Sequence, residues 1–273
     1  MPELPELEVV REVLEREVTR RRIMGVDILR PTVVRDLTQE GFVEGLRGRA
    51  ISGVWRRGKF IVLDLEAGRH LTINPMLAGR LQLAASGDKR LPRTALILRL
   101  DNGRELRYAD RRDMGKVYLT DDLHTIPTWD EIGPDALDPA LTLEVFRERL
   151  SRHRGEIKGI LVNHRFVAGI GNAYADEICW HAQLYPFRRR PELTDEEIAR
   201  LYHAMRDTLA EAIEQVRAQI GDEIHLKPRE FLAVHNKGGA PCPRCGTPIS
   251  QITARNRITS FCRQCQPGTL VRQ

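Results

Sequence analysis

The pattern of apolar and polar positions changes along the chain. Residues 6–20 carry apolar side chains at helical spacing with charges between them, at Leu7, Val10, Leu14 and Val18, which predicts an amphipathic first helix. Short apolar or alternating runs follow, bounded by Gly, Asp-Asn-Gly and charged turns. They lie at 51–55, 60–65, 71–73, 95–100, 106–108 and 117–119. Runs of this length between turn signals predict an antiparallel β-sandwich or barrel.

Beyond residue 120 the pattern becomes helical. The stretch 121–139 is rich in Asp, Pro and Thr, a composition that predicts a linker. Helical spacing predicts further helices, and the longest is expected to begin at a capping box formed by Thr194 and Glu197, because a hydroxyl followed three residues later by a carboxylate satisfies N–H groups at a helix start. The shorter helices are expected at 141–150, 156–162 and 172–180. One face of the long helix is expected to be buried: Ile198, Leu201, Met205, Leu209, Ile213 and Val216.

Composition narrows the class of protein. The chain has 273 residues, of which 41% are hydrophobic, so it is long enough for more than one domain with a packed core. The net charge of +5 comes from 43 Lys and Arg against 38 Asp and Glu, so an anionic partner must be met by local clusters of cations. Five such clusters occur, at 20–22, 56–59, 111–112, 152–154 and 188–190, although any one of them alone is typical of a solvated surface.

The sequence contains no pattern typical of a membrane span or a secretory signal. No apolar run approaches the roughly 18 residues that a membrane span needs, and the acidic residues Glu3 and Glu6 are atypical of a secretory signal. We expect a cytoplasmic protein.

Four of the five cysteines have the spacing of a metal site. Cys242 and Cys245 form one Cys-x-x-Cys pair, and Cys262 and Cys265 form a second pair sixteen residues later. This spacing predicts one structural zinc ion with four thiolate ligands and no open position. Disulfide or redox pairing is the alternative, which a reducing cytosol disfavours. Zinc would hold a hairpin too small to fold by its own core, whereas Cys179 is interpreted as an inert buried thiol.

The chain begins Met-Pro-Glu-Leu-Pro-Glu. If Met1 is removed, as a small second residue generally permits, Pro2 becomes an N-terminal secondary amine with the carboxylate of Glu3 beside it. Attack of that amine on a sugar C1′ gives an iminium ion, which activates the neighbouring C–H bond for elimination. In the alternative interpretation Pro5 begins the first helix and the glutamates complement its dipole. The hexapeptide alone leaves both interpretations open.

A Gly-Ile-Gly-Asn turn at 169–172 precedes an expected helix. Its free N–H groups and the amide of Asn172 could bind a phosphate oxygen at the positive end of the helix dipole. An ordinary turn between two helices is the alternative. A dinucleotide-binding fingerprint is not supported, because the turn follows a helix rather than a strand.

Four of these features, in this order, resemble bacterial formamidopyrimidine-DNA glycosylases. They are Pro-Glu-Leu-Pro-Glu at 2–6, Arg-Arg-Gly-Lys-Phe at 56–60, the turn and helix start at 167–177, and the four-cysteine finger. The resemblance implies an α+β multidomain fold: an N-terminal antiparallel β-sandwich with flanking helices (1–122), a helix-two-turns-helix domain (133–222) and a zinc-finger β-hairpin (233–267). It implies a monomeric base-excision repair enzyme that acts on double-stranded DNA with oxidised bases or abasic sites.

The resemblance also assigns chemical roles. Pro2 would be the nucleophile that displaces the damaged base and forms a Schiff base at C1′. Glu3 would be the acid and proton shuttle at the sugar, with Glu6 as a supporting group. Lys59 would contact the phosphate beside the lesion and assist β-elimination. Arg257, one of two arginines expected near the hairpin turn, would grip the flanking phosphates and assist δ-elimination.

Other positions would contact DNA from both sides of the lesion. Asn172 and Lys158 match positions that bind backbone phosphates, and Arg93 and His153 match further basic positions. Arg112 would face the orphaned base.

Several positions depart from the family pattern. Met76 or Leu77 would fill the void left by the flipped base, in a stretch that lacks the usual His-Leu-x-Met-Ser-Gly. Met114 stands where an aromatic wedge is usual, and it should stack less well while still filling space. The segment 220–235 is shorter than the typical loop that caps an everted 8-oxoguanine. We therefore expect weaker selectivity for 8-oxoguanine than for ring-opened purines. The alternative is that residues from His225–Arg229 rebuild the cap.

Two other functions fit part of the sequence. An endonuclease VIII-like glycosylase for oxidised pyrimidines uses the same chemistry; the short capping segment favours it, and Leu4, where that enzyme usually has Gly, opposes it. A non-catalytic DNA-damage-binding protein would need the finger and the basic clusters. Such a protein would not need Pro2 and Glu3, because phosphate binding requires neither.

Overall fold

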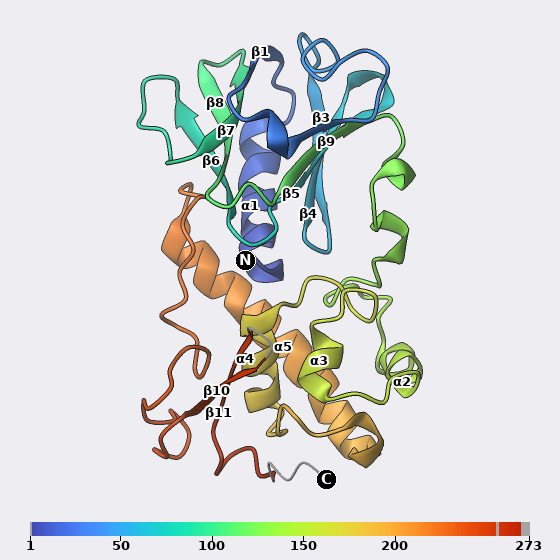
Figure 1. Ribbon diagram of the computed structural model, residues 1–273, viewed down its shortest axis with the longest axis vertical. Coiled ribbons are helices and arrows are strands. Elements are labelled where there is room, and N and C mark those ends of the chain that lie inside the picture. The colour runs from blue at the N-terminus through green and yellow to red at the C-terminus, as the bar shows by residue number, and fades with distance from the viewer. Residues whose placement is uncertain (1, 255–256, 269–273) are drawn as a thin grey trace. The chain divides into compact units, whose positions relative to one another are not determined.

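The computed structural model describes residues 2–254 and 257–268 (Figure 1). Met1, Arg255, Asn256 and residues 269–273 lie outside the described residues. The chain divides into two compact units. Unit 1 comprises the residues up to 131 together with 216–228, and unit 2 comprises 132–215 together with the residues from 229 onward.

Unit 1 contains one long helix and two β-sheets. Helix α1 spans Leu4–Val18, as its apolar spacing predicts. One sheet has the order β1-β7-β8-β6, with bounds Ile23–Ile28, Thr94–Leu100, Arg104–Asp110 and Gly79–Ala85. The other has the order β2-β9-β5-β4-β3, with bounds Val34–Asp36, Lys116–Thr120, Arg69–Asn74, Phe60–Leu65 and Ile51–Arg57. Neighbouring strands are antiparallel except for the pair β2 and β9.

The core of unit 1 joins α1 to both sheets. Leu14 of α1, Leu71 of β5 and Leu98 of β7 are at most 1% exposed and belong to one apolar cluster. Burial of this cluster is the main stabilising contribution to the unit, because each buried aliphatic side chain contributes about 1.5–3 kcal/mol. The predicted antiparallel sandwich is therefore confirmed.

Three strands were not among the predicted runs. Strand β1 contains Gly25 and Asp27, and its pairing with β7 shifts register between Ile23 and Gly25. Strand β2 has only three residues, and β6 begins at a glycine. Glycine, aspartate and short length all weaken the alternation that marks a strand.

The predicted linker is wrong for its first half. Short 3₁₀ turns occupy Leu123–Thr125 and Trp129–Glu131, and Trp129 is 3% exposed. Its ring packs edge-on against Trp55 and Phe60, with centroid separations of 5.9 and 5.5 Å. The guanidinium of Arg57 lies 5.1 Å from the centroid of the same ring. Residues 121–131 are thus part of unit 1, because their tryptophan completes its aromatic cluster.

Unit 2 is helical with a terminal hairpin. Its helices are α2 (Leu143–Ser151), α3 (Ile157–Leu161), α4 (Asn172–His181) and the part of α5 (Asp195–Ile220) up to residue 215, and its strands are β10 (Ser250–Ala254) and β11 (Arg257–Phe261). The predicted capping box forms at the start of α5: Glu197 N–H donates to Thr194 Oγ1, and Thr194 N–H donates to the Glu197 carboxylate. The predicted apolar face of α5 is buried. Among the described residues, none of the helices is both long and apolar enough to cross a bilayer.

We expect Trp129→Ala to destabilise unit 1 by about 3–5 kcal/mol, since it removes a fully packed aromatic side chain and leaves a cavity. Urea unfolding followed by tryptophan fluorescence measures the loss. Asp130→Ala is the matched control, because Asp130 lies in the same turn but is exposed, and its ion pair with His124 is exposed as well. Equal stability of the two variants would show that 121–131 contributes no packing.

Candidate functional site

The start of α1 holds two buried carboxylates next to Pro2. Pro2 is buried, and Glu3 and Glu6 are each 3% exposed. Glu3 is the N-cap residue of the helix, and Glu6 Oε2 accepts a hydrogen bond of 2.8 Å from the backbone N–H of Glu3. Pro5 lies in the first turn, which agrees with the capping interpretation of this hexapeptide, while the nucleophile interpretation stays a prediction. The same geometry fixes Pro2 and Glu3 at the tip of a rigid helix.

A pocket opens beside Pro2. It has a volume of about 340 Å³, counting the part open to solvent, and its lining is mostly apolar. Two cationic side chains, Arg80 and Lys227, line it together with Glu6. An apolar recess with a carboxylate and cations suits a flat polar ring such as a nucleobase.

The segment 220–235 reaches this pocket despite its short length. Ile224, Leu226 and Lys227 line it, and Ile224 is 2% exposed and belongs to the core cluster of unit 1. Two ion pairs fix the end of α5 and the start of this segment to α1. Arg217 Nε and Nη2 lie 3.0 and 2.8 Å from the two carboxylate oxygens of Glu12, and Arg16 binds Asp222. The segment is therefore anchored on the helix that carries Pro2.

Lys59 lies in the two-residue turn of the β3–β4 hairpin. Gly58 has φ of +58°, a backbone conformation that favours glycine, and Arg57 pairs with Phe60 across the turn. Arg56 Nε lies 2.8 Å from Glu8 Oε2 of α1. Burial acts to raise the pKa of Glu8, but the charge and hydrogen bond of Arg56 outweigh it and the pKa is lowered. This ion pair fastens the Lys59 hairpin to α1.

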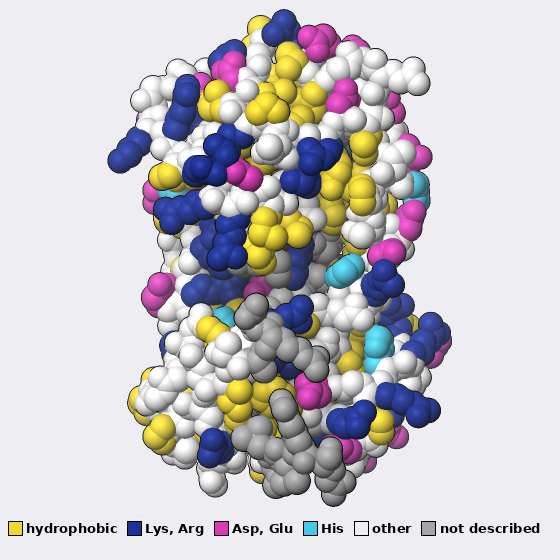
Figure 2. All heavy atoms as spheres, viewed as in Figure 1, with side chains coloured by type: hydrophobic (Ala, Val, Ile, Leu, Met, Phe, Trp, Pro, Cys, Tyr) yellow, Lys and Arg dark blue, Asp and Glu magenta, His cyan; other side chains and the backbone are white. Residues whose placement is uncertain are grey.

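The residues predicted to fill the DNA void lie on two exposed turns of unit 1. Met76 and Leu77, between β5 and β6, are 38% and 39% exposed, and Met114, between β8 and β9, is 41% exposed. Arg112 is exposed on the same turn as Met114. Figure 2 shows Lys and Arg side chains gathered around hydrophobic ones on the visible face of this unit. Equal exposure leaves the choice between Met76 and Leu77 open.

One buried hydroxyl lies beneath both turns. A Cβ added at Gly79 or at Gly115 would come within 2.5 or 1.8 Å of the Tyr108 hydroxyl, so both turns need glycine at these positions. Asp110, fully buried, accepts hydrogen bonds from the N–H groups of Arg112 (2.9 Å) and Gly115 (2.7 Å). The two turns are thus fixed to one support.

In unit 2 the predicted phosphate ligands point to the finger. Lys158 is 6% exposed, and its ammonium donates to the Ile258 carbonyl (2.7 Å) and to Thr259 Oγ1 (2.8 Å) and lies 2.6 Å from Asp176 Oδ1. Asn172 Nδ2 donates to the same carbonyl at 2.7 Å. Arg257, the neighbour of Ile258, is exposed at the start of β11. Both side chains therefore hold the strand that presents Arg257.

His153 is partly buried beside Phe166, with ring centroids 5.3 Å apart. Burial, together with the nearby Arg149, lowers its pKa. A neutral imidazole offers one N–H donor to a phosphate rather than a positive charge. Its role in DNA binding stays a prediction.

Sequence reasoning missed two carboxylates on α4. Glu177 accepts hydrogen bonds from the backbone N–H groups of 233–235 at 2.7–2.9 Å. Burial raises its pKa, although these three bonds oppose the shift. Asp176 contacts His235 and the backbone N–H of Ser260 as well as Lys158. The signal available in the sequence was an Asp-Glu pair in an otherwise apolar helix.

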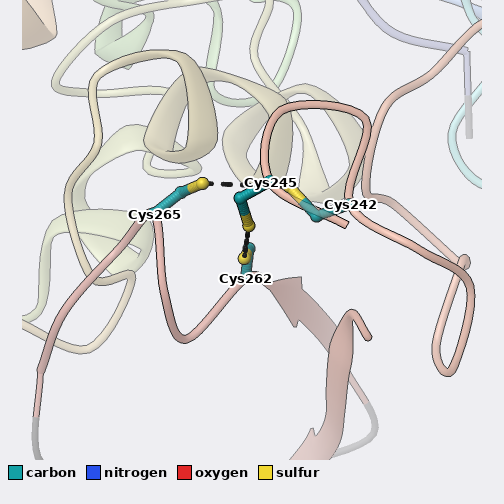
Figure 3. A group of neighbouring side chains, drawn as sticks. All are labelled: Cys242, Cys245, Cys262 and Cys265. Atoms are coloured by element: carbon teal, nitrogen blue, oxygen red, sulfur yellow. Dashed lines mark hydrogen bonds between the residues drawn. The ribbon is translucent and has the colours of Figure 1, made fainter. Parts of the chain in front are cut away.

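The four predicted zinc ligands converge (Figure 3). Their sulfur atoms lie within 4.8 Å of one another, with 3.4 Å between Cys245 and Cys262 and 3.9 Å between Cys242 and Cys265. Four thiolates at this spacing fit tetrahedral zinc. Cys179 is fully buried, and burial raises its pKa, as expected for an inert thiol.

Three family models match consecutive parts of the chain. They are the formamidopyrimidine-DNA glycosylase N-terminal domain (residues 1–117), the H2TH domain of the same enzymes (132–223) and the zinc finger found in FPG and IleRS (239–268). The chain belongs to the formamidopyrimidine-DNA glycosylase family. Its resemblance to that family is thereby confirmed, as are the implied α+β fold and zinc finger.

Individual family members are similar over their whole length. A formamidopyrimidine-DNA glycosylase of Pelotomaculum thermopropionicum is 38% identical, and the alignment covers 97% of this chain and 99% of that one. A Lactococcus lactis FPG mutant in complex with Fapy-dG containing DNA has a TM-score of 0.87 and 30% identity, with 98% and 100% covered. The wild-type L. lactis enzyme with an oxidized pyrimidine containing DNA has a TM-score of 0.86, 30% identity and the same coverage.

We expect one zinc ion per chain, held by the four cysteines. Cys262→Ser should release it and disorder the hairpin that carries Arg257, because metal binding supplies folding energy that the small hairpin core cannot. Metal analysis and DNA affinity measure the effect, and Cys179→Ser is the control thiol. Zinc-free wild-type protein, or unchanged DNA affinity of Cys262→Ser, would contradict it.

Proposed function

We propose that this family member removes oxidised purines, namely formamidopyrimidines and 8-oxoguanine, and nicks the strand by β,δ-elimination. As a formamidopyrimidine-DNA glycosylase, it is a DNA glycosylase of base-excision repair with lyase activity at abasic sites. The observation that carries the proposal for substrate and residues is the pocket lined by Pro2 and Glu6. A nucleobase in that pocket would bring its sugar to the N-terminal nitrogen.

The proposed chemistry begins at the sugar. The amine of Pro2, exposed by removal of Met1, attacks C1′ and loses its proton as the bond from C1′ to the base breaks and the base leaves with a proton. Opening of the C1′–O4′ bond, with a proton delivered to O4′, then gives the iminium ion, which acidifies the adjacent C–H bond. Glu3, buried next to Pro2, is the proposed group that donates and accepts protons at the sugar. Glu6 holds Glu3 through its backbone N–H and so acts as the supporting group.

The elimination steps expel phosphate. Each C–O cleavage leaves negative charge on a phosphate, and fixed cations stabilise that charge as it develops. Lys59, on the hairpin fastened to α1, is the proposed cation for the first elimination. Arg257, on the strand held by Lys158 and Asn172, is the proposed cation for the second. Arg93, Arg112 and His153 are proposed DNA contacts.

The endonuclease VIII-like alternative retains one specific argument. The wild-type L. lactis complex contains oxidized pyrimidine DNA, so a related enzyme accommodates such a base. Leu4, where endonuclease VIII usually has Gly, and the match to the formamidopyrimidine-DNA glycosylase family favour purines for this chain. A DNA substrate also supports the predicted cytoplasmic, nucleoid-associated location. We further propose the predicted division into three domains, at 1–122, 133–222 and 233–267.

We expect borohydride to trap a covalent adduct between Pro2 and a duplex with an abasic site, because the iminium ion is reducible. One extra residue before Pro2 should abolish trapping, since it converts the amine to an amide. Pro5→Ala is the control, as that proline is in the helix start without a reactive nitrogen. Undiminished trapping by the extended protein, with mass spectrometry placing the link on a lysine, would refute the assignment.

We also expect faster single-turnover excision of ring-opened guanine than of 8-oxoguanine opposite cytosine. The cap segment contributes mainly apolar side chains to the pocket, and an enclosure with few edge contacts discriminates less between bases. Leu226→Ala should slow 8-oxoguanine removal more than removal of the ring-opened base, whose glycosidic bond is more labile. The expectation would be wrong if the wild type removed 8-oxoguanine and ring-opened guanine at equal rates, both far above the rate for oxidised pyrimidines. That result would show that the short segment still forms hydrogen bonds to the edge of the base.

A further inference from the structure

An acidic side chain lies at the tip of a turn predicted to enter DNA. Asp113 stands between Arg112 and Met114, and its φ of +53° turns its carboxylate away from them toward two other loops. A carboxylate here would repel phosphates unless its charge is compensated. The surrounding residues provide that compensation.

Two arginines from distant loops bind Asp113. Arg30, which follows β1, contacts both carboxylate oxygens, with Nε 2.7 Å from Oδ1. Arg93, which precedes β7, donates from Nη2 to Oδ2 at 2.6 Å. Two positive charges thus meet one negative charge, so the cluster keeps a net positive charge. Arg93 remains 47% exposed in its side chain, with further N–H donors on its guanidinium.

Lys116 also connects the β8–β9 turn to the segment that follows β1. Its ammonium donates to the Asp113 carbonyl (3.4 Å) and to the Thr32 carbonyl (3.2 Å). The β8–β9 turn is therefore fixed from within by Asp110 and from outside by Arg30 and Lys116. The hydrogen bond and charge of Arg30, with those of Arg93, outweigh the opposing effect of burial and lower the pKa of Asp113, so the carboxylate stays ionised at neutral pH.

We propose that Asp113 is a positioning residue for DNA engagement: it presets Arg93 as a phosphate-binding group and fixes the turn that carries Arg112 and Met114. The inference rests on the proposed function, since it takes these residues to face DNA. Preorganisation of this kind reduces the ordering cost of binding. Asp113 itself makes no contact with substrate and acts through its two arginines.

The test compares Asp113→Asn with Asp27→Asn. Asp27 pairs with Arg99 across β1 and β7 of the same sheet, with similar partial exposure, so the control makes the same change in net charge but removes an ion pair of Arg99 and not one of Arg30 or Arg93. The probe is a duplex with a reduced abasic site, and affinity is measured against salt concentration.

Asp113→Asn should weaken binding several-fold and lower the salt slope by about one, the effect of one lost phosphate contact. Asp27→Asn should do neither.

Cleavage of a preformed abasic site separates positioning from folding. Asp113→Asn should slow cleavage more in duplex DNA, where Arg112 and Met114 have an opposite strand to engage, than in single-stranded DNA. Arg30→Gln should reproduce this difference and add little to Asp113→Asn, because the two residues act as one unit. Because the abasic site is preformed, this assay does not depend on the proposed removal of a base. A variant that still cleaves single-stranded DNA is also shown to be folded.

Two results would overturn the proposal. Tighter binding by Asp113→Asn with a steeper salt slope, beyond the change in Asp27→Asn, would mean that Asp113 restrains Arg93. Wild-type behaviour of both Asp113→Asn and Arg30→Gln would mean that the cluster does not affect DNA engagement.

Discussion

Burial of α1 is the constraint on which the catalytic unit depends. The proposed nucleophile is the N-terminus of the processed chain, and chain ends fray unless packing holds them. Here Leu4 and Leu14 are fully buried and the helix shares one core with both sheets. Glu8 then holds the Lys59 hairpin, and Glu12 holds the segment that lines the pocket. One helix therefore sets the geometry between the proposed nucleophile, the proposed cation Lys59 and the segment that lines the pocket.

Unit 2 fixes its functional strand by charge and metal rather than by a large core. The hairpin buries few apolar side chains, chiefly Ile249 and Phe261, so zinc and polar contacts must supply the rest. Asp176 and Lys158 connect α3 and α4 to β11 through short contacts. Their burial is tolerated because each charge has several partners. Removal of either partner would leave an uncompensated charge beside Arg257.

Features encoded locally were predictable, and features that depend on distant partners were not. The capping box at Thr194 and the zinc spacing involve residues close in sequence, so the pattern identifies them directly. Trp129 lies in a stretch whose composition predicts a linker, and only Trp55 and Phe60, far earlier in the chain, explain its burial. The reach of Leu226 into the pocket likewise depends on where α5 ends against α1, which segment length alone does not reveal.

The modest net charge of a DNA-repair enzyme has a structural explanation in these contacts. Cations in three predicted DNA-binding regions form ion pairs with acidic residues: Arg56 with Glu8, Arg93 with Asp113, and Lys158 with Asp176. Flexible cations would lose side-chain entropy on meeting a phosphate. Cations already held by carboxylates lose less, at the cost of a lower net charge. Some of the acidic residues that lower the net charge therefore hold the predicted DNA-facing cations in position. Composition alone shows the low net charge but does not show this role.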